Sequence, residues 1–431
     1  MRRLLLILFL PTMLWAQETT TDEVGEVNER AQTNVFAEAK GKLLRWKLKP
    51  KDLIEVKKYA IQKIKLNGKP VTRYAHHRIL MQVKDKNKEK GYQFSGTFES
   101  KFRFERKVRV SYQAEEYHKS NFYIEPRGRF HMAKNVYMPN VRNIPFFPAT
   151  EDPNLEGKNQ LKKGDSWESA GTEVMRFGKR LIKLPLEVTF EYGGRRTVNS
   201  NEGYKNIHKI IVNYNINYEN AKNKGNIPKK AFGYATAIYF WDEEAHMPYY
   251  AQEDYNIIMM YSNGQTSEFQ IKSKSAYRKI KPLGKKKKKK LQKDLTAKIA
   301  KAFKNKKAPT VKKVKDGLSI NLPDVLFEYN SDELTDDSED VLNGIIDVLE
   351  EYPGVHVRVQ GHTDNTGAAG YNKKLSNNRA KSVVDYIMTN SNMKSERFSY
   401  KGLGESQPIA SNKTPSGRKK NRRVEFIILD K

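Results

Sequence analysis

The stretch "GHTDNTGAAGYNKKLSNNRAKSVVDYI", Gly361 to Ile387, joins a strand to a helix and sets the fold of the last quarter of the chain. The preceding "VHVRVQG" alternates apolar and polar residues, which is typical of a strand with one buried face. The following "NKKLSNNRAKSVVDYIM" predicts a helix whose apolar side is formed by Ala380, Val383, Val384 and Ile387. The corner between strand and helix carries Asp364, and Arg379 follows it on the helix.

Asp364 and Arg379 place opposite charges around this corner. Asn372 and Arg379 lie two turns apart on one side of the helix, with Leu375 between them. A carboxylate and a guanidinium that face one gap suit a zwitterion, because Asp binds an ammonium group and Arg binds a carboxylate in a two-pronged manner. Thr366 and Asn372 can serve the remaining donors and acceptors. The residue types alone favour a simpler interpretation, in which Asp364 pairs with Arg379 or caps the helix.

Other kinds of functional site find little support in the sequence. The P-loop pattern G-x-x-x-x-G-K-[ST] is absent, as is the dinucleotide pattern G-x-G-x-x-G. The eight His are scattered, and His362 has no second ligand at metal-binding spacing. Neither a nucleophile elbow nor a pair of catalytic carboxylates stands out. The sequence therefore predicts no enzyme, no cofactor and no metal site.

The N-terminus predicts export. Arg2-Arg3, the apolar run Leu4 to Leu14 and the small residue Ala16 form a signal peptide over residues 1–16, followed by a loose polar segment over residues 17–40. The apolar run is too short to span a bilayer, which needs about 20 residues. The chain has no cysteine, which excludes disulfides and a lipid-modified N-terminal Cys. The net charge of +30 therefore need not indicate nucleic acid, and none is predicted as a partner.

Residues 41–277 are predicted to form a β-rich domain. Apolar residues alternate with polar ones from Tyr92 to Phe104, from Leu184 to Tyr192 and from Ile210 to Tyr218. Asn263-Gly264 predicts a hairpin turn, and the Pro-rich segment from Met138 to Gly171 predicts long loops. The alternation fits a soluble sandwich or half-open barrel, and it also fits a membrane barrel. The irregular crossing and the charges close to the apolar stripes favour the soluble form.

Residues 278–315 are predicted to be a Lys-rich linker. They hold eighteen basic residues and one acid, Asp294. Like charges at this density favour a solvated, extended tether. Apolar residues recur four apart from Leu291 to Phe303, which allows a short amphipathic helix. The lysines from Lys285 to Lys290 also suit an anionic envelope surface, although we favour a tether with attachment as a side effect.

Residues 316–431 have a balanced charge and alternate helices with strands, which predicts a two-layer α/β domain. "VQGHTDNTGAAGYNKKLSNNRAKSVVDYIM", followed by "YKGLGESQPIASNKTPSGRKKNRRVEF", resembles the OmpA-like C-terminal domain family, which includes the peptidoglycan-associated lipoprotein and MotB. "VLFEYNSDEL" fits the first strand and loop of that family, and the resemblance covers residues 318–431. It implies noncovalent binding of peptidoglycan through the diaminopimelate of the stem peptide. The implied binding residues are Asp364, Arg379, Asn372, Thr366, Leu375 and Asn330.

Together these features predict a multidomain, noncatalytic envelope protein of a diderm bacterium, located in the periplasm or at the outer membrane. Peptidoglycan is its expected partner, and an envelope protein is a further candidate partner for the β-rich domain. The alternative is an outer-membrane porin with a periplasmic wall anchor. The resemblance ends at the linker, so it assigns nothing to the β-rich domain.

Overall fold

A computed structural model describes residues 44–104, 113–131, 147, 161–177, 180–200, 203–281, 284–303, 309, 311–314, 317–323, 327–328 and 331–429. The predicted signal peptide, the segment 17–40, most of the Pro-rich crossing and Asn330 lie outside these residues. The β-rich region and the C-terminal domain fall within one compact unit. Among the described residues, no helix is long and apolar enough to cross a membrane.

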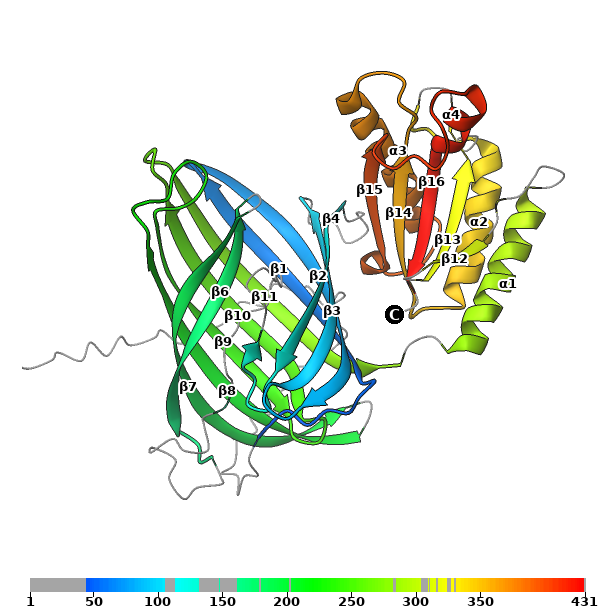
Figure 1. The fold of residues 1–431 in the computed structure, drawn as a ribbon. Coiled ribbons are helices and arrows are strands. Elements are labelled where there is room, and N and C mark those ends of the chain that lie inside the picture. The colour runs from blue at the N-terminus through cyan, green and yellow to red at the C-terminus, as the bar shows by residue number, and fades with distance from the viewer. Residues whose placement is uncertain are drawn as a thin grey trace, which may run out of the picture. The chain divides into compact units, whose positions relative to one another are not determined.

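The β-rich region is one continuous sheet that curls into a half-open barrel (Figure 1). Its strands are β1 (Leu53–Leu66), β2 (Lys69–Asn87), β3 (Gly91–Arg103), β4 (Gln113–Ile124), β5 (Phe130–His131), β6 (Ser166–Phe177), β7 (Arg180–Ser200), β8 (Gly203–Glu219), β9 (Lys230–Asp242), β10 (Met247–Met260) and β11 (Thr266–Ile280). The order is β4-β3-β2-β1-β11-β10-β9-β8-β7-β6, and neighbours run antiparallel. Because all these strands belong to one continuous sheet, the structure confirms the predicted half-open barrel. It does not show a sandwich of two sheets.

The alternating pattern separates the two faces of this sheet. On β8, Ile210, Val212, Tyr214 and Ile216 are buried, whereas Asn213 and Asn215 between them are exposed. Most buried apolar side chains of the strands join one cluster, and Ala60, Ala75 and Phe102 form a smaller one on the same face, which points inward. The predicted strand from Tyr92 is confirmed as β3, although Phe104 lies beyond its end and is 62% exposed. The Asn263-Gly264 turn is also confirmed, because Gly264 adopts a φ of 79° between β10 and β11.

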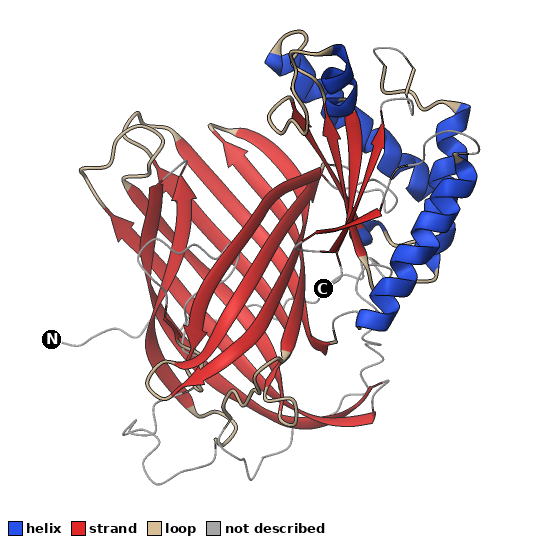
Figure 2. Ribbon diagram, turned by 45° about the vertical axis from the view of Figure 1, so that its right-hand side comes forward, coloured by secondary structure: helices blue, strands red, loops and turns tan. Residues whose placement is uncertain are grey.

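The C-terminal domain combines a mixed sheet with helices (Figure 2). Its elements are α1 (Lys285–Ala302), β12 (Val311–Val314), β13 (Gly317–Pro323), α2 (Asp336–Glu350), β14 (His356–His362), α3 (Ala369–Thr389), η3 (Ser395–Arg397), β15 (Phe398–Gly404), α4 (Pro415–Asn421) and β16 (Arg423–Leu429). The strand order is β12-β13-β16-β14-β15, and β14 runs parallel to β15 because α3 connects them. Val357 and Val359 of β14 join the core shared with the helices, so the intervening Arg358 faces away from it.

The expectation of a solvated tether is wrong for α1. Leu291, Leu295 and Ile299 are fully buried in the core of the C-terminal domain, while most of the lysines stay exposed. Tyr352 donates a hydrogen bond to Asp294 at 3.0 Å, and Lys298 contacts Asp347 of α2 at 2.8 Å. The apolar residues four apart therefore outweigh the repulsion between lysines, because they bury a continuous stripe. The short amphipathic helix that the sequence allowed in this segment is confirmed. The other predicted domain bounds remain predictions.

This packing predicts an asymmetry between the two faces of α1. Leu295→Ala should lower the free energy of unfolding of the C-terminal domain by about 2–5 kcal/mol, because it leaves a cavity in the core. Lys289→Ala, on the exposed face, should change it by less than about 0.5 kcal/mol. Urea denaturation followed by helical circular dichroism measures this, since every helix in the described residues belongs to the C-terminal domain. Equal urea midpoints for the two variants would contradict the burial of this helix face and would favour the extended tether.

Candidate functional site

The candidate site lies where β14 ends and α3 begins. Gly361 is required here because a Cβ on it would lie 1.9 Å from the Ser376 carbonyl oxygen of α3, so strand and helix approach closely. Gly367 turns the chain toward α3 with a φ of +91°, which other residues rarely adopt. The Thr363 amide donates to the Gly404 carbonyl at 3.0 Å and ties the loop to the end of β15. The predicted strand-to-helix corner is therefore present and held rigidly.

Asp364 begins the corner and is 6% exposed. One carboxylate oxygen accepts from the Thr366 amide at 2.9 Å, and the other accepts from Nη1 of Arg422 at 2.7 Å. Burial by itself raises the pKa of Asp364, but the hydrogen bonds from Arg422 and Thr366 outweigh it and hold that pKa below its ordinary value. Asp364 is therefore an anion at neutral pH.

Arg379 approaches the corner from α3 and is 4% exposed. Its Nε donates to the Ser331 carbonyl oxygen at 2.8 Å, and its guanidinium lies 5.0 Å from the ring centroid of Phe327. A guanidinium carries five N–H donors in a planar fork, so the bond to Ser331 uses one of them and fixes the plane. The hydrogen bonds and ion pairs of Asp364 go instead to Thr366 and Arg422, so the internal Asp364–Arg379 pair is not the arrangement observed.

The supporting residues occupy different positions around the corner. Asn372 is buried, and its Nδ2 donates to the carbonyl oxygens of Asp364 and Thr366 at 3.4 and 3.1 Å and to Glu405 at 2.8 Å. Thr366 is exposed, while Leu375 is half-buried on α3 between Asn372 and Arg379. The structure thus joins Asp364, Thr366 and Asn372 by hydrogen bonds at the corner and places Leu375 and Arg379 farther along α3. The sixth predicted residue, Asn330, lies outside the described part of the chain.

Sequence reasoning missed Arg422, whose ion pair with Asp364 joins residues 58 positions apart. It also missed Glu405, which holds Asn372. Both occur in motif segments that the resemblance already covers, "GLGES" and "NRRVEF", but the sequence does not say which of several basic residues reaches the corner. The pairing depends on β16 lying beside β14, with Arg423 of β16 in register with His362.

The Arg422 contact makes a testable electrostatic prediction. Arg422→Ala should raise the pKa of Asp364, because the burial that opposes ionisation remains while the principal hydrogen bond from a cation is lost. Lys420→Ala, which removes a nearby exposed cation from α4, is the matched control and should leave that pKa unchanged. Carbon-13 NMR of the Asp364 carboxyl across a pH titration measures both variants. A pKa unaltered by Arg422→Ala would contradict the assigned contact.

The remaining chemistry at the corner is limited. His362 ends β14 and lies 3.7 Å from Glu425. Burial lowers its pKa against the opposing effect of Glu425, so it is neutral at neutral pH. In the described ranges, no group of three or more His, Cys, Asp or Glu side chains could hold a metal ion. The arrangement that stands out is a buried anion next to the exposed residues 365–370, with a buried cation, Arg379, on the helix that follows.

Comparisons with known proteins find similarity in the C-terminal domain. Residues 326–422 match the model of the OmpA family. Over 104 residues the chain is 44% identical to the outer-membrane lipoprotein YfiB of Pseudomonas aeruginosa, covering 24% of this chain and 61% of YfiB. Over 89 residues it is 45% identical to the peptidoglycan-binding protein ArfA of Mycobacterium tuberculosis, covering 21% of this chain and 27% of ArfA. The chain thus spans less than two thirds of either relative.

Solved structures are similar to about a third of the chain at lower sequence identity. The cell wall anchor of the T6SS from Pseudomonas aeruginosa is 28% identical, with 32% of this chain and 99% of that chain covered and a TM-score of 0.27. The periplasmic domain of Helicobacter pylori MotB is 27% identical, with 31% of this chain and 85% of that chain covered and a TM-score of 0.28. These TM-scores are too low to support a structural inference.

Proposed function

Residues 326–422 are an OmpA family domain, and from this premise we propose that the protein is a noncatalytic, exported envelope protein that binds peptidoglycan noncovalently. The relatives bear the names of a peptidoglycan-binding protein and an outer-membrane lipoprotein. In this proposal the C-terminal domain attaches the β-rich region to the cell wall. The protein acts in the periplasm or at the outer membrane of a diderm bacterium.

The proposal depends on one observation: the buried Asp364 and Arg379 form hydrogen bonds with different partners. Asp364 is held by Arg422 and the Thr366 amide, whereas Arg379 is held by the Ser331 carbonyl. A ligand with adjacent ammonium and carboxylate groups can then meet both charges in a poorly hydrated setting, where such contacts are stronger than in water. The side-chain end of diaminopimelate has this pair of groups.

The same geometry distinguishes between diamino acids. Asp364 would bind the side-chain ammonium of either diaminopimelate or ornithine. Arg379 would bind only diaminopimelate, because the ornithine side chain ends without a carboxylate. Asn372 would hold the loop that carries Asp364, and Thr366 and Leu375 would contact the ligand from the turn and from α3.

The faces of the half-open barrel support an aqueous location for the β-rich region. Its inward face is mainly apolar and also holds the Lys58–Glu253 ion pair. Its outward face mixes polar positions such as Asn213 and Asn215 with the exposed Phe232 and Tyr234 of β9, so it forms no continuous apolar band in β8 and β9. A porin wall has the opposite arrangement, with an apolar outward band that faces lipid. We therefore place the β-rich region in the periplasm as a candidate site for an envelope protein partner. The lysines from Lys285 to Lys290, which are exposed apart from the half-buried Lys288, add a secondary attraction to anionic envelope surfaces.

Sedimentation with purified sacculi tests the proposal. The mature chain, residues 17–431, should co-sediment with sacculi that contain diaminopimelate. It should be released by a stem peptide in which the α-amino and α-carboxyl groups of diaminopimelate are in peptide bonds, and less effectively by the same peptide with ornithine in that position. It should also stay monodisperse without detergent, which a porin would not. Absence of binding, or equal release by the two peptides, would overturn the proposed recognition. Binding that only salt reverses would assign the attachment to the lysines of α1 instead.

A further inference from the structure

The outward face of β1–β3 differs from the other outward faces of the half-open barrel. Its charged side chains are buried: Lys101 is 1% exposed, Arg78 3% and Glu99 4%. They stand side by side across the strands, because Arg78 pairs with Lys57 on β1 and with Glu99 on β3. We call this surface the docking face, and its residues are Glu55, Lys57, His76, Arg78, Glu99 and Lys101.

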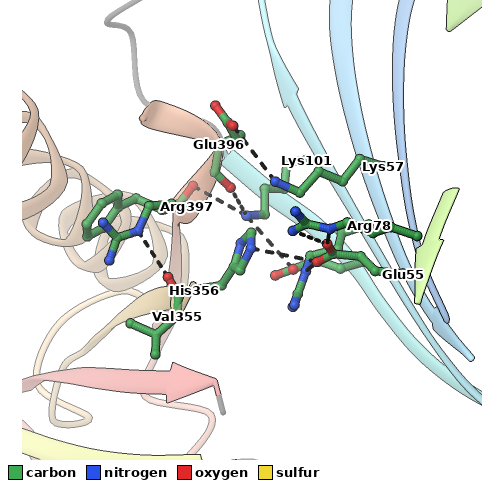
Figure 3. Close-up of polar contacts among 11 residues, drawn as sticks. Glu55, Lys57, Arg78, Lys101, Val355, His356, Glu396 and Arg397 are labelled. Carbon is green, nitrogen blue, oxygen red and sulfur yellow. Dashed lines mark hydrogen bonds and ion pairs between the residues drawn. The ribbon is translucent and has the colours of Figure 1, made fainter. Parts of the chain in front are cut away.

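Residues of the C-terminal domain contact the docking face (Figure 3). Nη2 of Arg358 on β14 lies 2.9 Å from Oε1 of Glu99. Nζ of Lys101 donates to the Glu396 carbonyl oxygen at 3.1 Å, and Nζ of Lys57 lies 3.9 Å from the Glu396 carboxylate. His356 of β14 lies 3.9 Å from Glu55. These contacts come from the start of β14 and from η3, at the face of the sheet that the helices leave uncovered.

The charges on the two sides are complementary. Glu99 lies between Lys101 at 3.8 Å and Arg358 at 2.9 Å, and Glu55 is held by Arg78 and Arg278 of its own sheet. Burial of a lone Lys or Arg costs several kcal/mol, so such residues are retained inside an interface when a partner of opposite charge faces them. A surface built only to face water would not need this alternation of signs.

Backbone pairing adds a second, independent contact. Gln113 of β4 pairs in parallel with Tyr400 of β15. β4 and β15 are the end strands of the two regions, and unpaired end strands readily add a neighbour. The backbone bridge and the charge cluster therefore both connect the β-rich sheet to β14 and β15 of the C-terminal domain.

We propose that the C-terminal domain docks on the outward face of β1–β3 of its own chain, so that the wall-binding domain and the β-rich region move as one rigid body. The docking contacts use the beginning of β14, at His356 and Arg358. The corner with Asp364 follows the other end of that strand, about 20 Å away at about 3.3 Å per residue. Docking therefore leaves the wall-binding corner open, and the β-rich region is held at a fixed orientation to the wall.

A charge-exchange experiment on the mature chain tests the docking. Because the chain has no cysteine, Asn215→Cys on β8 and Lys293→Cys on α1 can carry two spin labels, both at exposed positions. Electron paramagnetic resonance should give one narrow distance distribution. Glu99→Arg or Arg358→Glu should lower the docking equilibrium at least about a hundredfold and broaden that distribution, because each places like charges in a buried pair. The double exchange should restore part of the narrow distribution, because the opposite pair is recovered while Lys101 still lies 3.8 Å from position 99.

Glu268→Arg is the matched control, because it reverses a charge in the exposed Lys65–Glu268 pair on the same sheet. It should leave the distance distribution unchanged. A broad distribution in the unsubstituted chain would overturn the proposal, as would single exchanges that leave it narrow or a double exchange that restores nothing. A narrow distribution that disappears when labelled chains are diluted with unlabelled ones would show docking between two copies and would also overturn it.

Discussion

Asp364→Ala is expected to abolish sedimentation of the mature chain with sacculi while the chain keeps its fold. Removal of one partner from a buried charge pair costs about 2–5 kcal/mol of binding free energy. The affinity should therefore fall by about thirtyfold to several thousandfold. Stability should fall modestly, because the Thr366 amide also loses its acceptor, whereas the Arg422 left behind has a side chain that is 36% exposed and can be hydrated. Thermal unfolding of the same sample checks this second point.

Arg379 gives a complementary test of the same corner. Arg379→Lys keeps a positive charge but loses the planar fork, so it should weaken binding to sacculi strongly. Arg379→Ala should weaken binding at least as much, with some loss of stability because its contacts with Ser331 and Phe327 disappear. Lys374→Ala, at an exposed position of α3, is the matched control and should bind as the unsubstituted chain does. Sacculus binding that survives both Asp364→Ala and Arg379→Lys would remove these residues from the site.

The corner was predictable because its information is local. The alternation before Gly361 and the helical spacing after it fix a strand and a helix, and they place Asp364 and Arg379 near each other. The ion pair between Asp364 and Arg422 was not predictable, since it depends on which strands become neighbours in the sheet. Periodicity within a segment carries no information about that order.

The segment of α1 shows a conflict between two local signals. Charge density predicted an extended tether, while apolar residues four apart allowed a helix. Burial of Leu291, Leu295 and Ile299 determined the outcome, and it needed a surface on α2 that the linker sequence does not contain. Acidic residues on the domain, such as Asp347, also accept contacts from its lysines.

The docking face shows where period-2 patterns mislead. Glu55, Arg78 and Glu99 occupy outward positions, and a charged outward position normally indicates solvent. They are buried because another domain of the chain covers them. An alternating pattern assigns residues to the two faces of a sheet, but it does not say what lies against either face.

Acidification is expected to release the C-terminal domain from the docking face. His76 on β2 and His356 on β14 are both buried there, and burial, followed by nearby cations, lowers the pKa of each well below 6.5. The groups around them are Glu55 and Lys57 on β1, Arg78 on β2, Glu99 and Lys101 on β3, Arg278 on β11, Arg358 on β14 and Glu396 on η3. Cations outnumber carboxylates in this set, so two further positive charges oppose docking.

The direction of the pH effect follows from proton binding. In the undocked chain the two histidines are hydrated and take up protons as the pH falls below about 6.5, whereas the docked chain keeps them neutral. Docking is therefore fully present above that pH and is lost progressively below it. Lys101 and then Arg358 of the C-terminal domain outweigh the effect of burial on Glu99 and lower its pKa, so protonation of Glu99 acts in the same direction at lower pH. The cations that lower the pKa of Glu55 belong to its own sheet and remain after release.

Spin-label distances on the mature chain at pH 7.5, 6.0 and 5.0 measure this release, with a narrow distribution expected at the first value and a broad one at the last. His356→Gln removes one titrating group and keeps a polar side chain, so the release should move to lower pH. His131→Gln changes a histidine of β5 that is outside the docking face and is the matched control. A distribution that stays narrow throughout, or a His356→Gln chain that responds as the unsubstituted chain does, would show that the buried histidines do not control docking.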